Sequence, residues 1–394
     1  MRTDRKGIAA LTLVLQMAGC ADVDEGGESF REERFETSET AVRDTPGRAL
    51  FNDATFGGNG RTCRTCHSSG TGTVSPEEAR LRFSRNPNDP LFLHDGLDDG
   101  VRGVTRMLER ATFRIQLPLP PNVVLAHSPA RSVVVLRASL STNNVALENT
   151  LMNDGREATL ETQALGAIHG HAQNTLAPTP GQLEAIAEFE RSREFFTSAR
   201  LWAYANGGAE PGLPVGRTQA ERRGRRFFEN IPFAPNAAGT HMSLDGICAH
   251  CHSGPMLNTA NGHGPFPVNT RFTTAGVSEL NRSGNTVRTF VFTLADGTST
   301  EVTSPDPGRA LITGKAADAN LFKTPSLWGI NRTAPYFHDH SARDFDELLD
   351  HYQAFFDTAP TPVPVAHFTH QDREDLKAFL RLLDQPPSAH SDQP

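Results

Sequence analysis

The chain has 394 residues, a formal net charge of −8 at pH 7 and 37% hydrophobic residues. This length predicts two or three domains, and the apolar content is sufficient to build ordinary cores. The acidic balance disfavours a nucleic-acid partner, which would require a basic face. The basic run ERRGRR at 221–226 is interpreted as the exposed side of a helix, with Phe227 and Phe228 packed beneath it.

The N-terminal 20 residues have the order of an export signal. The basic stretch MRTDRK is followed by GIAALTLVLQMAG, which is apolar but short for a membrane span, and then by Cys20. We expect a lipoprotein-type signal peptide over residues 1–20, a lipid anchor on Cys20 as the contact with the membrane, and a periplasmic or cell-envelope location. Simple cleavage and secretion is the alternative, because Met17 stands where leucine is commoner. Residues 21–44 are acidic and poor in apolar side chains, which predicts a disordered tether.

The other four cysteines form two copies of one motif. CRTCH comprises Cys63, Cys66 and His67, and CAHCH repeats the pattern with Cys248, Cys251 and His252. The likeness extends upstream, since GRALFND at 47–53 precedes the first copy and GRRFFEN at 224–230 precedes the second. A pattern repeated at this distance is typical of a duplicated domain rather than a short-period solenoid.

Three chemistries compete for the CxxCH motifs. A zinc ribbon would need its two cysteine pairs about 15–20 residues apart, and a redox dithiol does not need the histidine. CxxCH is the attachment motif of c-type haem, in which the adjacent histidine binds the iron. Two copies in an exported chain therefore predict two covalently bound c-type haems, with His67 and His252 as proximal ligands. A binding module stabilised by disulfides or zinc remains as an alternative.

Two further segments carry a family resemblance. They are LMNDGREATLETQALGAIHGHAQ at 151–173 and LFKTPSLWGINRTAPYFHDHSARDFDELLDHY at 321–352. Together with the two CxxCH motifs, they resemble the bacterial di-haem cytochrome c peroxidase superfamily, which includes the enzyme that matures the methylamine dehydrogenase cofactor. The resemblance runs from about residue 45 to 385. It implies a mainly α fold with two cytochrome-c-like haem domains in tandem, residues 45–205 and 215–385, and small β additions.

The resemblance also implies roles around the first haem. Peroxide would react there, beneath Gln163. The acid–base glutamate of the family corresponds to Gln173, and an amide cannot shuttle a proton as a carboxylate does. His169 or His171 could substitute, because imidazole titrates near neutral pH, although a structural role weighs as heavily. Asn153 stands where the family has a tryptophan that bridges the haems.

At the second haem, the resemblance places Tyr352 where the peroxidases have a methionine ligand. A phenolate in that position would stabilise ferric or higher-valent iron. The alternative is a core position, because Tyr352 belongs to an apolar stripe with helical spacing: Phe345, Leu348, Leu349 and Phe356. His338 matches a histidine near the haem propionates. Trp328 is read as a packed core residue.

Two features around the haems are left open by the resemblance. Thr333 and Pro335 match residues whose carbonyls bind calcium between the haems of relatives, but Ala138 stands at the nearest match for the third ligand. Residues 86–144, with β-rich runs and proline-rich turns, are longer than in short peroxidases and are expected beside the first haem. His94 and His127 are the candidate distal ligands in this segment, although a lone loop histidine usually faces solvent.

The preferred hypothesis is a peroxidase-type haem enzyme. A small redox protein such as a cytochrome c would reduce the C-terminal haem, and electrons would cross to the N-terminal haem, where hydrogen peroxide is reduced. One alternative is a maturation-type or oxygenase-type enzyme that acts on an organic or protein substrate. The other is a di-haem electron-transfer protein without turnover, which the residues Gln173 and Asn153 favour. Whether the chain forms a homodimer is left open.

Overall fold

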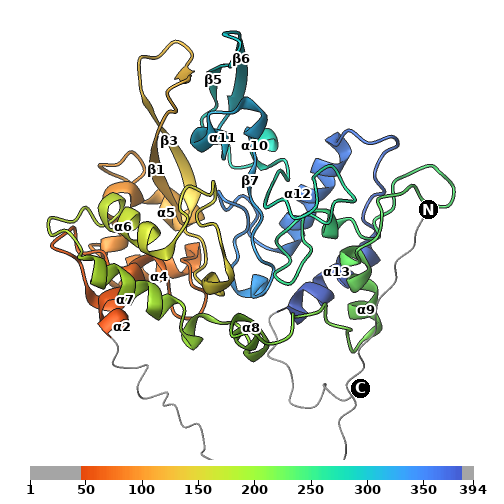
Figure 1. Ribbon diagram of the computed structural model, residues 1–394, viewed down its shortest axis with the longest axis horizontal. Coiled ribbons are helices and arrows are strands. Elements are labelled where there is room, and N and C mark those ends of the chain that lie inside the picture. The colour runs from red at the N-terminus through yellow and green to blue at the C-terminus, as the bar shows by residue number, and fades with distance from the viewer. Residues whose placement is uncertain (1–45, 384–394) are drawn as a thin grey trace, which may run out of the picture. The chain divides into compact units, whose positions relative to one another are not determined.

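A computed structural model describes residues 46–383 of the chain (Figure 1). The expected signal peptide, the lipidated Cys20 and the acidic tether lie outside these residues. Helices dominate and strands are few, which confirms the mainly α fold with small β additions. Within the described residues, no helix is long and apolar enough to cross a membrane.

In the first half, which we define as residues 46–205, the helices surround the first cysteine motif. Helix α6 begins where the Thr159 side chain accepts a hydrogen bond from the backbone N–H of Thr162, and α7 begins with a capping box between Thr179 and Gln182. The helices of this half are α2 (Pro46–Asp53), α3 (Cys63–Cys66), α4 (Pro76–Arg85), α5 (Thr105–Arg110), α6 (Leu160–Gly170), α7 (Pro180–Glu190) and α8 (Ala199–Ala205).

In the second half, residues 206–383, three longer helices build the core. Helix α12 begins at Asp344, whose carboxylate caps the helix by accepting a hydrogen bond from the Glu347 N–H at 2.9 Å. The apolar stripe of α12 packs with α13, and with Phe227 and Phe228 just after α9, in one buried cluster. The helices of this half are α9 (Gln219–Arg225), α10 (Val277–Leu280), α11 (Ala310–Thr313), α12 (Phe345–Thr358) and α13 (His370–Leu382).

One helix crossing occurs in both halves. Helix α2 packs on α7, and α9 packs on α13, each through a glycine at the point of contact. A Cβ on Gly47 would lie 1.9 Å from the Ala185 carbonyl oxygen, and a Cβ on Gly224 would lie 2.0 Å from that of Asp375. Only glycine allows two backbones to approach so closely. The GR segments that precede the two cysteine motifs therefore make equivalent contacts, as expected for a duplication.

The strands connect the two halves. Strands β1 (Thr112–Pro118) and β3 (Ser132–Ala138) pair antiparallel, and β5 (Arg288–Thr293) and β6 (Ser299–Ser304) form a hairpin. Strand β2 (Val123–Leu125) of the first half pairs with β5 of the second, which gives the sheet order β2-β5-β6. A short pair, β4 (Phe272–Thr273) with β7 (Phe322–Lys323), completes the strands. The hairpins lie together at the top of Figure 1.

A buried ionic cluster also crosses between the halves. Arg137 on β3 donates to Asp306 at 2.7 Å and to Asp154 at 2.5 Å, and all three side chains are at most 4% exposed. Burial alone would raise the pKa of Asp306, but the Arg137 guanidinium outweighs it and holds this pKa below its usual range. The division of the chain at residues 205 and 215 stays a prediction, because contacts of this kind join the segments on either side of it.

Candidate functional site

Both CxxCH motifs hold their histidine in the same way. The Nδ1 atom of His67 lies 2.7 Å from the Gly72 carbonyl oxygen, and Nδ1 of His252 lies 2.8 Å from that of Leu257. In each case the acceptor is five residues further along the chain. With Nδ1 committed as the donor, the Nε2 lone pair is free to bind a metal, and the ring orientation is fixed.

Burial lowers the pKa values of both histidines, which favours the neutral rings that can bind a metal. It lowers the pKa of His67 to about 4 and the pKa of His252 to about 4. Both rings are therefore neutral at neutral pH, which is the form that binds iron. The geometry and protonation state of the two residues fit an axial haem ligand.

The four thiols are buried and belong to two separate motifs. They are all free cysteines, and burial raises the pKa of Cys63 to about 12 and that of Cys66 to about 11. Burial has the same effect at Cys248 and Cys251. A zinc site needs thiolates that are easily formed and gathered in one cluster. Across residues 46–383, no three His, Cys, Asp or Glu side chains are gathered to hold a metal ion.

Helix α6 ends beside the first motif, and the residues expected over the first haem lie along it. Gln163 is half-buried in the helix, and Gln173 follows the helix end with a φ of +50°. The Asn59 side chain donates to the Gln173 side-chain oxygen at 3.1 Å and to the His171 carbonyl at 2.9 Å. Asn59 therefore links the side chain of Gln173 to the backbone of His171, whose imidazole, unlike an amide, can be protonated.

The other histidines of this region differ in their surroundings. His169 is exposed, and its Nδ1 lies 2.6 Å from the Asn174 side-chain oxygen. His94 and His127 are exposed and have φ values of +47° and +58°. His171 is the histidine of this group that is hydrogen-bonded to a buried carboxylate, that of Asp95. Distal ligation by His94 or His127 stays a prediction.

Tyr352 lies beside the second motif. It projects from α12 into the second-half core, where its ring centroid is 6.0 Å from Phe337 and 5.9 Å from Phe356. Burial, with a further contribution from the Cys251 and Cys248 thiols, raises the pKa of the Tyr352 phenol. Among the described residues its hydroxyl makes no hydrogen bond. Tyr352 thus belongs to the apolar stripe of α12 and also lies near the second cysteine motif, so its position is compatible with both interpretations.

The remaining second-half candidates are buried at the junction of the halves. His338 stacks on Phe322 at a centroid distance of 3.8 Å, and its Nε2 lies 3.8 Å from the Asp306 carboxylate. The Trp328 indole donates to the Pro255 carbonyl at 2.8 Å and packs between the halves against Phe196 and Met256, as expected for a core residue. The calcium site, which rests on backbone carbonyls at Thr333 and Pro335, stays a prediction.

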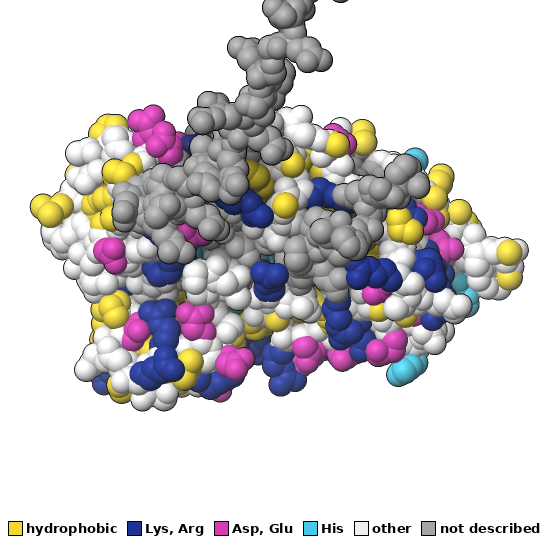
Figure 2. Space-filling view, turned by 90° about the horizontal axis from the view of Figure 1, so that it is seen from below, with side chains coloured by type: hydrophobic (Ala, Val, Ile, Leu, Met, Phe, Trp, Pro, Cys, Tyr) yellow, Lys and Arg dark blue, Asp and Glu magenta, His cyan; other side chains and the backbone are white. Residues whose placement is uncertain are grey.

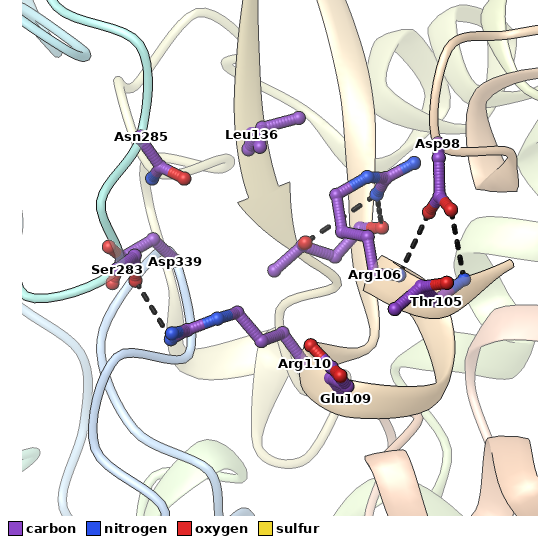
Figure 3. Close-up of a pocket in the computed structure, with 10 residues that line it drawn as sticks. Asp98, Thr105, Arg106, Glu109, Arg110, Leu136, Ser283, Asn285 and Asp339 are labelled. Carbon is purple, nitrogen blue, oxygen red and sulfur yellow. Dashed lines mark hydrogen bonds between the residues drawn. The ribbon is translucent and has the colours of Figure 1, made fainter. Parts of the chain in front are cut away.

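A separate polar pocket lies between the halves (Figure 3). Arg110 of α5 reaches across it to donate to the Ser283 hydroxyl at 3.1 Å. Asp98 accepts from the backbone N–H groups of Thr105 and Arg106 at the start of α5. The cysteine motifs do not line this pocket.

The basic run at 221–226 behaves as its exposed-helix interpretation predicts. Arg223 pairs with Asp375 at 2.7 Å, and Arg226 pairs with Asp245 at 2.6 Å, while Phe227 and Phe228 are buried. Basic and acidic side chains are likewise interspersed on the face of the molecule that Figure 2 shows.

Sequence reasoning missed the residues that position His171. Arg61 and Asp95 are both buried, and each contacts His171. The only local signal was that Arg61 stands two residues before Cys63. Asp95 carries no motif, because its partners are 34 and 76 residues away in the sequence.

Comparison with known proteins supports the family resemblance that the motifs indicate. Residues 45–199, which contain the first CxxCH motif and the DGR segment, match the family model described as di-haem cytochrome c peroxidase. The resemblance to the di-haem cytochrome c peroxidase superfamily is confirmed. The second motif, at 248–252, lies beyond the range that this model matches.

Individual members of the di-haem peroxidase family resemble shorter parts of the chain. A cytochrome c551 peroxidase of Nitrosomonas europaea is 34% identical over 88 residues, 22% of this chain and 24% of that protein. A cytochrome-c peroxidase of Denitromonas iodatirespirans is 29% identical over 143 residues, 36% of this chain and 37% of that protein. The chain thus matches well under half the length of either relative. The crystal structure of a diheme peroxidase from Burkholderia thailandensis aligns with 88% of this chain and 86% of its own, at 16% identity and a TM-score of 0.49.

Proposed function

We propose that the chain is an exported di-haem c-type peroxidase. The observation that carries the proposal is the repeated CxxCH motif, in which each histidine presents a free Nε2 because its Nδ1 is held by a carbonyl. The family match over residues 45–199 supports it. The equivalent helix crossings at Gly47 and Gly224 support two cytochrome-c-like haem domains in tandem.

The chain's own residues would hold each haem in the same manner. Two thiols of each motif form thioether bonds, and His67 or His252 binds the iron. A bound haem supplies a redox centre that accepts and releases electrons. Tyr352 is proposed as the second ligand of the C-terminal haem, because its hydroxyl has no hydrogen-bonding partner among the described residues and it lies within electrostatic range of the Cys248 and Cys251 thiols. Gln163 would orient peroxide at the N-terminal site.

The proposed partners follow from this electron flow. A small redox protein such as a cytochrome c delivers electrons to the C-terminal haem, and hydrogen peroxide receives them at the N-terminal site. With two protons and two electrons, one peroxide gives two waters. A lipid on Cys20 would keep the enzyme at the cell envelope.

A second candidate function is electron transfer without turnover. The amide of Gln173, in place of a carboxylate, and the absence of a tryptophan at Asn153 favour it. The spin state of the N-terminal haem separates the two functions, because an open iron is high-spin and a closed one is low-spin.

The first experiment counts the haems. Pyridine haemochrome analysis after acid–acetone extraction is expected to give two retained haems per chain, and one after Cys63→Ala/Cys66→Ala or Cys248→Ala/Cys251→Ala. Peroxide-dependent oxidation of a reduced small cytochrome c then tests turnover. Loss of all haem on extraction would reject covalent attachment, and two haems without turnover would favour the electron-transfer function.

A further inference from the structure

The side chain of Asp95 lies between a buried arginine and His171. It sits in the short turn His94–Gly96 and is 4% exposed. One carboxylate oxygen accepts a hydrogen bond from Arg61 Nη1, and the other is bonded to Nδ1 of His171. An arginine, a carboxylate and an imidazole thus form a continuous chain.

Several backbone hydrogen bonds fix the position of Arg61 and, through it, the geometry of the Arg61–Asp95–His171 hydrogen-bond network. Its guanidinium is 2% exposed and donates to the carbonyls of Pro90, Leu91 and Leu93, and to the carbonyl of His171 at 3.3 Å. Since Arg61 precedes Cys63 by two residues, it joins the haem-attachment segment to the end of α6. Buried polar groups that are fully bonded in this way specify a single geometry.

The charge on Asp95 determines which ring nitrogen of His171 carries the proton in the neutral imidazole. Burial would raise the pKa of Asp95, but the hydrogen bond and charge of His171 and the charge of Arg61 hold it below its usual range. A carboxylate without a proton can only accept, so Nδ1 of His171 is the donor. In the neutral form of the ring, Nε2 of His171 then carries the lone pair and can act as a base.

His171 also lies near the first cysteine motif. It lies within electrostatic range of His67, because its charge contributes to the lowered pKa of that ring, although burial is the larger cause. The Phe113 ring packs edge-on against it at 6.1 Å, and its carbonyl shares the Asn59 amide with Gln173. The side chain of Gln173, which corresponds to the acid–base glutamate of the family, is therefore linked through Asn59 to the backbone of His171.

We propose that His171 is the proton-transfer residue of the N-terminal haem site, and that Asp95 and Arg61 are its positioning residues. The proposal rests on the peroxidase function proposed above. Nε2 takes the proton from one oxygen of hydrogen peroxide and delivers it to the other, which leaves as water when the O–O bond breaks. The two electrons come from the external redox protein, and two solvent protons complete the second water.

The test compares three variants of the full-length holoprotein. Hydrogen cyanide binds ferric haem as an anion, so its binding rate reports a base at the site independently of turnover. His171→Gln is expected to slow both cyanide binding and peroxide turnover by about 10²–10⁴-fold. Asp95→Asn is expected to slow both by about 10–100-fold, because an amide no longer fixes the tautomer. His169→Gln is the control, because that exposed ring bonds to Asn174, and it should change neither rate.

The outcomes separate this proposal from the function on which it rests. Equal cyanide rates in wild type, His171→Gln and His169→Gln would overturn the proposal, whatever the turnover. A wild type that is inert toward peroxide, with cyanide binding still slowed in His171→Gln, would reject the peroxidase function and keep the base. If His171→Gln converts the N-terminal haem from low-spin to high-spin, His171 is an iron ligand and the proposal fails. Should Asp95→Asn not fold, His171→Gly with added imidazole replaces it, and recovery of the cyanide rate is expected.

Discussion

Glu190 is a buried carboxyl group near the first cysteine motif. It is 3% exposed at the end of α7, and its Oε2 has no hydrogen-bonding partner among the described residues. Burial raises its pKa to about 8. Its charge adds to the effect of burial on the Cys63 thiol, whose pKa is about 12.

The residue makes the stability of the fold pH-dependent. An unfolded carboxyl group titrates near 4.5, whereas the folded one keeps its proton to about pH 8. Its contribution to stability is therefore complete below pH 4.5 and is lost as the pH rises through 8. We expect Glu190→Gln to gain about 2–4 kcal/mol of unfolding free energy relative to wild type between pH 5 and 8.5. Urea titrations at both pH values measure this gain, with the exposed Glu188→Gln as the control. A difference that does not vary with pH would contradict the expectation.

At the scale of elements, the repeated glycine crossing gives a sharp test of the packing. Gly224→Ala would place a methyl group 2.0 Å from the Asp375 carbonyl and 2.7 Å from the Phe379 Cβ. We expect a loss of about 1–3 kcal/mol or more in unfolding free energy, because neither backbone can yield without shifting a helix. Thermal unfolding measures the loss.

The matched control for this substitution is also a helical glycine. A Cβ on Gly181 would meet nothing within 4 Å, so Gly181→Ala should raise the unfolding free energy by about 0.5–1 kcal/mol. Equal effects of the two alanines would show that α9 and α13 do not cross as closely as the structure indicates.

The elements that could be predicted from the sequence depend on local signals. The strands in FRIQLPL and SVVVL, the β5–β6 hairpin and the Asp344 cap follow from alternation, turn residues and a side chain three positions from its partner. The pairing of β2 with β5 does not, because a three-residue strand carries little pattern. Asp95 was missed for a similar reason: its role depends on where a turn and a helix end meet in space.

At the scale of the whole molecule, Arg137 joins the halves through the buried carboxylate of Asp306 and also pairs with Asp154 of its own half. Arg137→Met would leave Asp154 and Asp306 without their main counter-charge. We expect a loss of about 3–5 kcal/mol in unfolding free energy at pH 7. Because burial without arginine raises carboxyl pKa values, the loss should shrink as the pH falls below about 4 and the acids protonate. Urea unfolding at pH 7 and pH 3.5 measures both effects.

Arg343→Met is the control for this prediction. Its guanidinium is 79% exposed and pairs with Glu347 on the surface, where solvent screening leaves such a pair with little effect on stability. If both arginine variants unfold at the same urea concentration, the Arg137 cluster does not stabilise the junction.

Strand β2 has a consequence for how such a chain can evolve. Although it belongs to the first half, it pairs with β5 and helps to cover Phe290 and Phe292, which are fully buried. A recombination breakpoint in the glycine- and proline-rich segment 206–216 would bring together a β2 and a β5 that had not been selected as a pair. The two halves can therefore not be exchanged freely between related genes: a chimaera that keeps the β2–β5 pairing must take residues 112–138 from the same parent as the second half.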